Sequence, residues 1–287
     1  MNKLILGTVQ MGLDYGINNS AGKIASDNCY DILSKAFELG IHTLDTAEAY
    51  GNAHQIIGGF HTLNPNIRFN VITKIPHDIE VDKIEDKIET YIQDLNVDCL
   101  DVLMFHSFDS YKDNQLIIEK LLNFKKQGLI KNIGVSVYTN KQIDALIDDE
   151  HIAVVQMPFN LLDNEFLRGS SMQKLKDNNK IIHTRSAFLQ GLFFKENFDK
   201  TIFEEIATEL NQIKDIANFE DTNISNLALS YCLNQNNIDK VLIGVDAVSQ
   251  LVDNYKALDF KINAESISKI NNIKVKNIDL LNPSLWT

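Results

Sequence analysis

Residues 69–106 read FNVITKIPHDIEVDKIEDKIETYIQDLNVDCLDVLMFH, and this stretch contains one complete unit of the pattern that decides the fold. Its two ends, 69–75 and 100–106, are short apolar runs of the kind that form buried parallel strands. Between them, apolar residues recur at spacings of four, three and four, as on one face of a helix. These residues are Ile84, Ile88, Tyr91 and Leu95. The stretch therefore predicts a strand, a helix and a second strand.

The same alternation continues along the chain. The apolar runs cover residues 4–8, 43–47, 69–75, 100–106, 130–137, 153–159, 180–186 and 240–245. Helical patterns fill the intervals; Ser26 is expected to cap the first of them and Gly40 to end it. Eight strand–helix units favour a (β/α)8 TIM barrel over a doubly wound sheet, which usually has fewer strands. We therefore predict an α/β fold with a single domain over residues 1–287.

Composition narrows the class of protein. Hydrophobic residues make up 44% of the chain and charged residues 23%, as in ordinary globular proteins. The net charge of −12 argues against nucleic acid or an anionic membrane as the main partner, because either needs a basic face. Cys29, Cys99 and Cys232 form neither a metal-binding spacing nor a disulfide framework. Without a signal peptide or an apolar stretch of membrane-spanning length, a cytoplasmic protein with no metal is expected.

Three successive predicted strands end in ionisable side chains. Asp45 lies at the end of the second run, Lys74 at the end of the third and His106 at the end of the fourth, and Tyr50 follows in a loop. Taken singly, each is more often a solvated or packed residue than a catalytic one. In a barrel, however, the carboxyl ends of the strands meet at one mouth, where active sites lie. A Lys⁺ held by Asp⁻ would favour ionisation of the Tyr hydroxyl, and a neutral His could hold a carbonyl oxygen. The set predicts a proton donor for carbonyl reduction.

Further stretches extend this pattern over nearly the whole chain. They are residues 6–8, 40–51, 73–74, 95–101, 133–136, 156–160, 186–192, 228–229 and 243–254. With them, the sequence resembles the aldo-keto reductase family. The resemblance implies that Tyr50 is the general acid, that Lys74 lowers its pKa, that Asp45 anchors Lys74 and that His106 orients the carbonyl.

The resemblance also implies a nicotinamide dinucleotide, NADPH or NADH, extended across the barrel mouth. No Gly-x-Gly-x-x-Gly motif follows the first strand, so the dinucleotide would not be held as in a Rossmann fold. The residues implied to contact it are Gly7, Thr8, Ser136, Gln156, Ser186, Gly244, Asp246, Gln250, Asp253 and Asn254.

Several positions depart from the family pattern. Val137 replaces a common Asn, Phe159 a common Tyr and His54 a common Glu, and no role is assigned to His54. Arg185 replaces a common aromatic residue; contact with pyrophosphate, contact with substrate and a simple rim charge are all open. Trp286, the single tryptophan, either caps the substrate pocket or anchors the C-terminal tail.

Asp246 stands where relatives that use NADPH usually carry Ser. A carboxylate there would repel a 2′-phosphate and accept a hydrogen bond from a free ribose hydroxyl, which favours NADH or relaxed cofactor choice. The alternative is that Asp246 merely caps a helix.

The leading hypothesis is reduction of an aldehyde or ketone by hydride transfer, in a monomer or small homo-oligomer. Asn160, Ser107 and His77 suggest a hydroxylated substrate such as a sugar or sugar derivative. A dinucleotide-binding regulatory or redox-sensing protein is the second hypothesis. A Schiff-base aldolase that uses Lys74 is the third.

Overall fold

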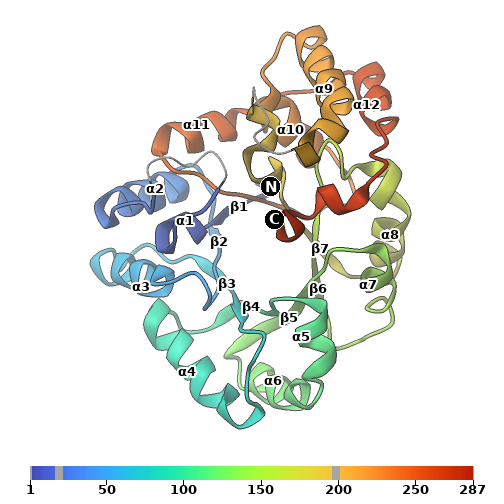
Figure 1. The fold of residues 1–287 in the computed structure, drawn as a ribbon. Coiled ribbons are helices and arrows are strands. Elements are labelled where there is room, and N and C mark those ends of the chain that lie inside the picture. The colour runs from blue at the N-terminus through green and yellow to red at the C-terminus, as the bar shows by residue number, and fades with distance from the viewer. Residues whose placement is uncertain (1, 17–21, 196–200, 287) are drawn as a thin grey trace.

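The structure, a computed structural model, describes residues 2–16, 22–195 and 201–286. Its strands are all parallel and close into a barrel in chain order, as Figure 1 shows in a view down the barrel. They are β1 (Leu4–Gly7), β2 (Thr43–Asp45), β3 (Asn70–Ile75), β4 (Leu100–Phe105), β5 (Ile130–Ser136), β6 (Val154–Pro158), β7 (Ile181–Arg185) and β8 (Lys240–Ile243). Each strand lies within the apolar run predicted for it, and the single-domain (β/α)8 barrel is confirmed.

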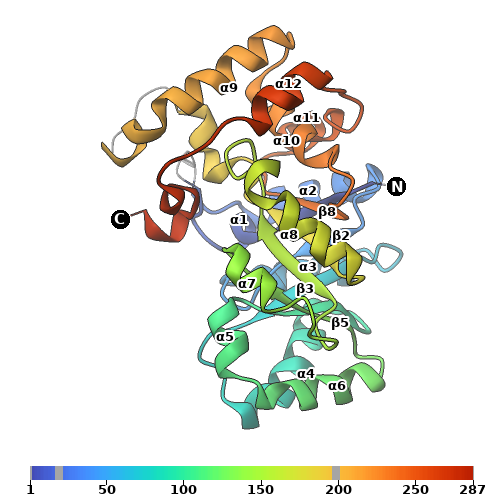
Figure 2. The ribbon, with the colours of Figure 1, turned by 90° about the vertical axis from the view of Figure 1, so that its right-hand side faces the viewer.

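Helices surround the barrel and fill most of the crossovers. The longer ones are α2 (Ser26–Glu38), α3 (Ala53–Leu63), α4 (Ile84–Leu95), α6 (Leu116–Lys126), α8 (Glu165–Asp177), α9 (Ala207–Phe219), α10 (Ile224–Leu233), α11 (Val248–Lys256) and α12 (Ala264–Asn271). Shorter pieces are α1 (Val9–Gly12), α5 (Phe108–Asp113), α7 (Asn140–Asp144), and the 3₁₀ turns η1 (Val81–Lys83), η2 (Leu189–Phe194), η3 (Thr201–Ile206), η4 (Ile278–Leu281) and η5 (Pro283–Leu285). Figure 2 shows α9, α10, α11 and α12 gathered on one side of the barrel.

The core has two layers because side chains alternate along each strand. A small cluster of Ile5, Ile72, Val102, Met104 and Val154 fills the barrel. The large cluster packs between strands and helices and includes the predicted face of α4, whose four apolar residues are all buried. The predicted cap of α2 was wrong: Ala25 is the capping residue, and Ser26 is the first residue of the helix. Gly40 follows the helix with a φ of 73°, a conformation that glycine adopts without strain.

The carboxyl ends of the strands therefore meet at one mouth of the barrel, where they carry polar side chains. Thr8 follows β1 directly, and Asp45, Lys74, Ser136 and Gln156 lie on the strands themselves, all of them buried. Within the described ranges, no helix combines the length and the apolar character needed to cross a membrane.

Candidate active site

A cavity of about 630 Å³ opens at the carboxyl ends of the strands. The four residues predicted for proton transfer, Asp45, Tyr50, Lys74 and His106, all line it. So do nine of the ten residues predicted to contact a dinucleotide, which are Gly7, Thr8, Ser136, Gln156, Ser186, Gly244, Asp246, Gln250 and Asn254. The structure thus brings together residues that are up to 247 positions apart, from Gly7 to Asn254.

Lys74 and Asp45 form a buried ion pair, and each side chain is only 2% exposed. The ammonium also donates to the Thr46 carbonyl oxygen at 3.2 Å, and Gln156 Nε2 donates to Asp45 Oδ2 at 2.8 Å. Burial alone would lower the pKa of Lys74, but the charges of Asp45 and Tyr50 outweigh burial and raise this pKa. Lys74 is therefore a fixed cation.

Tyr50 lies beside that cation, with its ring centroid 5.3 Å from Lys74 Nζ. Burial raises the pKa of the Tyr50 hydroxyl above its ordinary value, while Lys74 acts in the opposite direction. The Tyr50 backbone is held on both sides, since its N–H donates to Ala47 O at 3.0 Å and its carbonyl accepts from Ala53 N at 3.1 Å. The hydroxyl is consequently protonated at neutral pH and close to a positive charge.

His106 lies beside Tyr50 in the same cavity. Its ring meets the Tyr50 ring edge-on, with centroids 5.9 Å apart, and stacks on His77 at 5.5 Å. Burial, Lys74 and His77 together lower the pKa of His106 to about 4. Its Nδ1 is buried and has no hydrogen-bond partner among the described residues. A neutral imidazole and a phenol hydroxyl thus stand together, as hydrogen-bond donors to one carbonyl oxygen would.

The residues at the β8 end of the cavity form a second polar group. Gln250 Oε1 accepts from the Asp246 backbone N–H at 2.7 Å. Asp246 Oδ1 is buried without a described partner. Ala247, not Asp246, is the capping residue of α11 and no side chain caps that helix, so the helix-cap alternative for Asp246 is wrong.

Asp253 does not join this group. Its carboxylate is largely exposed and pairs with Lys256 at 2.7 Å. It lines an adjoining, larger hollow of about 1110 Å³ that shares Phe194, Ser225, Gln250 and Asn254 with the cavity.

The cavity also holds residues that sequence reasoning missed. Gln10, Tyr15, Tyr138 and Gln190 line it, and Gln10 Oε1 is buried without a described partner. Tyr138 follows β5 closely, so the strand-end rule could have found it, but no pattern marks the others. Among described residues, no three His, Cys, Asp or Glu side chains are grouped as a metal site.

Other residues singled out in the sequence lie elsewhere. Asn160 is fully buried and bonds to Leu162 N, Asp163 N and Ser186 O, so it is no guide to the substrate. Ser107 caps α5 and contacts His77 at 3.0 Å.

The remaining departures from the family pattern lie outside the cavity lining. Phe159 stacks on Tyr231 in the core, with centroids 5.4 Å apart. His54 is buried on the outer side of β3, where its Nε2 lies 2.8 Å from Thr73 Oγ1. Trp286 donates to Leu280 O at 3.0 Å, as expected of an anchor for the tail.

Comparisons with known proteins agree with this geometry. The model of the Aldo/keto reductase family matches residues 3–275. The NADH-specific methylglyoxal reductase of Escherichia coli is 21% identical, with 92% of this chain and 95% of that protein covered. L-galactose dehydrogenase of Arabidopsis thaliana is 23% identical, with coverages of 90% and 88%. The solved structure of an aldo-keto reductase from Bacillus halodurans superimposes with a TM-score of 0.77 at 19% identity, covering 95% of this chain and 92% of the other.

The family match spans the barrel and includes every strand that supplies the cavity. Membership implies oxidoreductase activity on small carbonyl compounds. The chain belongs to the Aldo/keto reductase family.

Proposed function

We propose that this protein is an NAD(P)H-dependent reductase of aldehydes or ketones with Tyr50 as the proton donor. The observation that carries the proposal is the wall formed by Tyr50, the buried Lys74–Asp45 pair and the neutral His106 in one cavity. Tyr50 provides the proton donor, Lys74 provides a positive charge that favours the ionised form of Tyr50, and His106 provides a second hydrogen-bond donor that orients the substrate carbonyl.

Each residue has a distinct part in the reaction. His106 and Tyr50 hold the substrate carbonyl oxygen by hydrogen bonds, which polarises the carbonyl carbon. Nicotinamide, when bound, supplies the hydride. Tyr50 transfers its proton to the oxygen as negative charge develops there, and Lys74 stabilises the phenolate that remains. Asp45, fixed by Gln156, keeps Lys74 in place.

The cavity residues fit a dinucleotide. Buried oxygens of Gln10 and Asp246 have no described partner, as expected of atoms that bond to a ligand. A Cβ at Gly244 would lie 2.5 Å from Gln10 Nε2, so glycine lets the Gln10 amide lie against the backbone at this end of the cavity. Ser136 and Gln156 would hold the nicotinamide end, and Asp246, Gln250 and Asn254 the adenosine end.

The adenosine end favours NADH. Asp246 presents a carboxylate oxygen without a described partner, and burial raises its pKa, as happens to a carboxylate out of water. Lys256, the next basic residue in the chain, is engaged with Asp253. The similarity to an NADH-specific relative supports the same preference.

Among substrates, a sugar or sugar derivative stays a candidate, supported by the similarity to L-galactose dehydrogenase. A regulatory protein with little turnover is the weaker alternative, because a sensor does not need the Tyr50–Lys74–Asp45 arrangement. For an aldolase, the amine of Lys74 would have to be neutral, whereas Asp45 keeps it charged.

A fluorescence titration with NADH and NADPH, followed by an aldehyde screen at the nicotinamide absorbance, tests the proposal. We expect saturable binding of at least one dinucleotide and turnover of some aldehydes. Binding without any turnover would instead support the regulatory alternative. Trapping of a substrate on Lys74 by borohydride, without dinucleotide binding, would support the aldolase.

A further inference from the structure

Arg185, the last residue of β7, is a cation in the cavity. Its charge influences the buried carboxylate of Asp163, but the two side chains form no direct bond. Its guanidinium lies over the Tyr138 ring, 4.1 Å from the centroid. Nη2 donates to Val137 O at 3.0 Å and Nη1 to Ser186 Oγ at 3.4 Å. None of the described Asp and Glu residues forms an ion pair with it. Because an arginine has five N–H donors, most remain free to bind a ligand.

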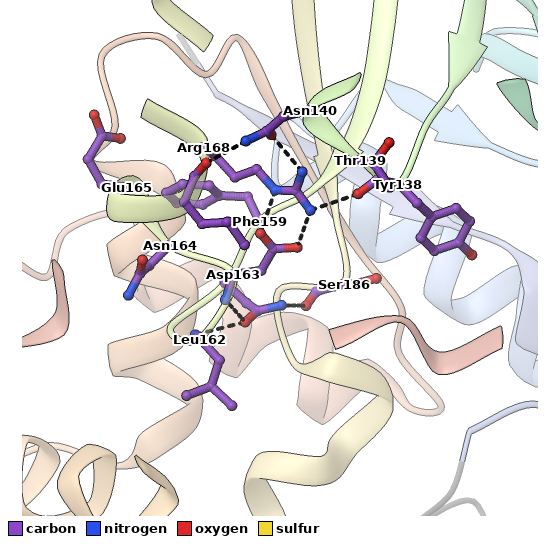
Figure 3. Close-up of polar contacts among 12 residues, drawn as sticks. Tyr138, Thr139, Asn140, Phe159, Leu162, Asp163, Asn164, Glu165, Arg168 and Ser186 are labelled. Atoms are coloured by element: carbon purple, nitrogen blue, oxygen red, sulfur yellow. Dashed lines mark hydrogen bonds and ion pairs between the residues drawn. The ribbon is translucent and has the colours of Figure 1, made fainter. Parts of the chain in front are cut away.

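The carboxylate that could have neutralised Arg185 is already engaged. Asp163 is fully buried and binds Arg168 through both oxygens, at 2.5 and 2.9 Å. Arg168 also bonds to Asn140 Oδ1 at 2.8 Å and to the Tyr138 carbonyl oxygen at 2.7 Å, as Figure 3 shows. This network fixes the Tyr138 segment on which Arg185 stacks and leaves Arg185 itself unpaired.

Arg185 is also close enough to the proton donor to act on it. Burial raises the pKa of Tyr50 and lowers the pKa of His106; the charge of Arg185 partly opposes the first shift and adds slightly to the second. Lys74 is the other Lys or Arg among the residues that line the cavity, and Asp45 neutralises it. In a protein of net charge −12, an unpaired arginine at this place selects for negative ligands.

The backbone that follows Arg185 turns repeatedly through positive φ, at Ser186 (63°), Leu189 (46°), Gln190 (53°) and Gly191 (91°). The N–H groups of Leu189 and Gly191 donate to Ser186 O and Phe188 O, at 2.9 and 2.8 Å. These two N–H groups are therefore not available to an anion, whereas the Arg185 guanidinium keeps free donors.

We propose that Arg185 binds an oxyanion, either a carboxylate or a phosphate, carried by the carbonyl substrate. The proposal rests on the proposed reductase function and narrows its substrates to anionic aldehydes or ketones. Arginine binds such groups through two parallel N–H bonds, a contact that lysine makes less well.

Two matched substrate pairs test this: succinic semialdehyde against butanal, and glyceraldehyde phosphate against glyceraldehyde. We expect wild type to prefer the anionic member of each pair at least about tenfold in kcat/KM, as a charge-assisted contact allows. Arg185→Met should lower kcat/KM for the anionic member about 100-fold, mainly through KM, and for the neutral member by less than about tenfold, because the neutral substrate loses only the influence of Arg185 on Tyr50 and His106. Arg185→Lys should recover part of the loss.

Arg68→Met is the control, because it removes the same charge from a side chain that caps α3 on the surface. It should leave both preferences unchanged. Equal losses for anionic and neutral substrates in Arg185→Met, accompanied by weaker dinucleotide binding, would show that Arg185 serves the cofactor instead. An unchanged preference in Arg185→Met would also overturn the proposal.

A binding measurement separates this inference from the reductase proposal. Calorimetry with succinate, in the presence of oxidised dinucleotide, reads the anion site without turnover. We expect wild type to bind succinate at least about tenfold more tightly than Arg185→Met. If wild type reduces no aldehyde, the reductase proposal fails while this comparison still decides the anion site. Equal affinities, or no binding by either protein, would refute the anion site even in an active reductase.

Discussion

Lys74 is a cation that the buried carboxylate of Asp45 keeps charged, and the contribution of this charge to kcat can be measured. Replacing Lys74 by Met should lower kcat at least about 100-fold, because the developing Tyr50 phenolate loses its nearby cation. The single variant leaves the Asp45 carboxylate buried without its ion-pair partner, which lowers the stability of the protein. The double variant Lys74→Met, Asp45→Asn removes both charges and is the measurement to rely on. Near-normal kcat in the folded double variant would contradict the proposed coupling.

Asp246 decides the choice of dinucleotide in this account. Wild type should favour NADH over NADPH in kcat/KM, because the carboxylate accepts a ribose hydroxyl and repels a 2′-phosphate. Asp246→Ser should shift the ratio toward NADPH at least about tenfold. Specificity constants for both dinucleotides check this. A hundredfold preference of wild type for NADPH would contradict the role proposed for Asp246.

Residue-scale expectations from the sequence succeeded where a strand fixed the side chain. Asp45 and Lys74 lie on parallel strands and His106 directly after one, so their convergence followed from the fold. Asn160 failed as a pocket residue because its amide caps a loop, a contact that depends on loop geometry and not on strand order. Arg185 likewise has no ion-pair partner among the described residues because Asp163 binds Arg168, and no local sequence pattern predicts that pairing.

Among the elements, short α1 positions the loop that carries Tyr50. A Cβ on Gly12, the last residue of α1, would lie 1.7 Å from the Tyr50 carbonyl oxygen, so the two segments touch through backbone. Gly12→Ala should therefore displace Tyr50 and lower kcat/KM at least about tenfold, since small misplacements of a catalytic group are costly.

Gly128→Ala is the matched control, because that glycine has a φ of 79° and open space around it. It should cost about 1 kcal/mol of stability and leave activity unchanged. Thermal melts and steady-state kinetics on both variants separate the two effects. Equal activity in the two variants would show that α1 does not position Tyr50.

Periodicity predicted the strands and long helices because each buries one face or both. It missed α1, α5 and η2, which are too short to show a repeat. Of these short elements, α1 and η2 follow β1 and β7 and line the cavity through residues such as Gln10 and Gln190, so the barrel was more predictable than the lining of its mouth.

The whole molecule should lose stability in mild acid. Burial lowers the pKa of His54, His106 and His183 from 6.5 to about 4 in each case. Because these histidines bind protons more readily when unfolded, their contribution is present above pH 6.5 and is lost as the pH falls toward 4. Each contributes at most about 3–4 kcal/mol.

Denaturant unfolding across this pH range measures the effect. His183→Gln removes one of the three groups, so the free energy of unfolding should depend less steeply on pH than in wild type. An identical pH dependence in the two proteins would contradict the assigned burial of His183.

The central claim, that Tyr50 is the proton donor of a dinucleotide-dependent reductase, is tested most directly by Tyr50→Phe. The variant removes only the hydroxyl, which contacts Lys74, while the ion pair with Asp45 still holds Lys74, so the dinucleotide Kd should stay within about threefold of wild type. Reduction should fall at least about 1,000-fold in kcat/KM, because the proton donor is gone. Near-normal turnover by Tyr50→Phe would contradict the account.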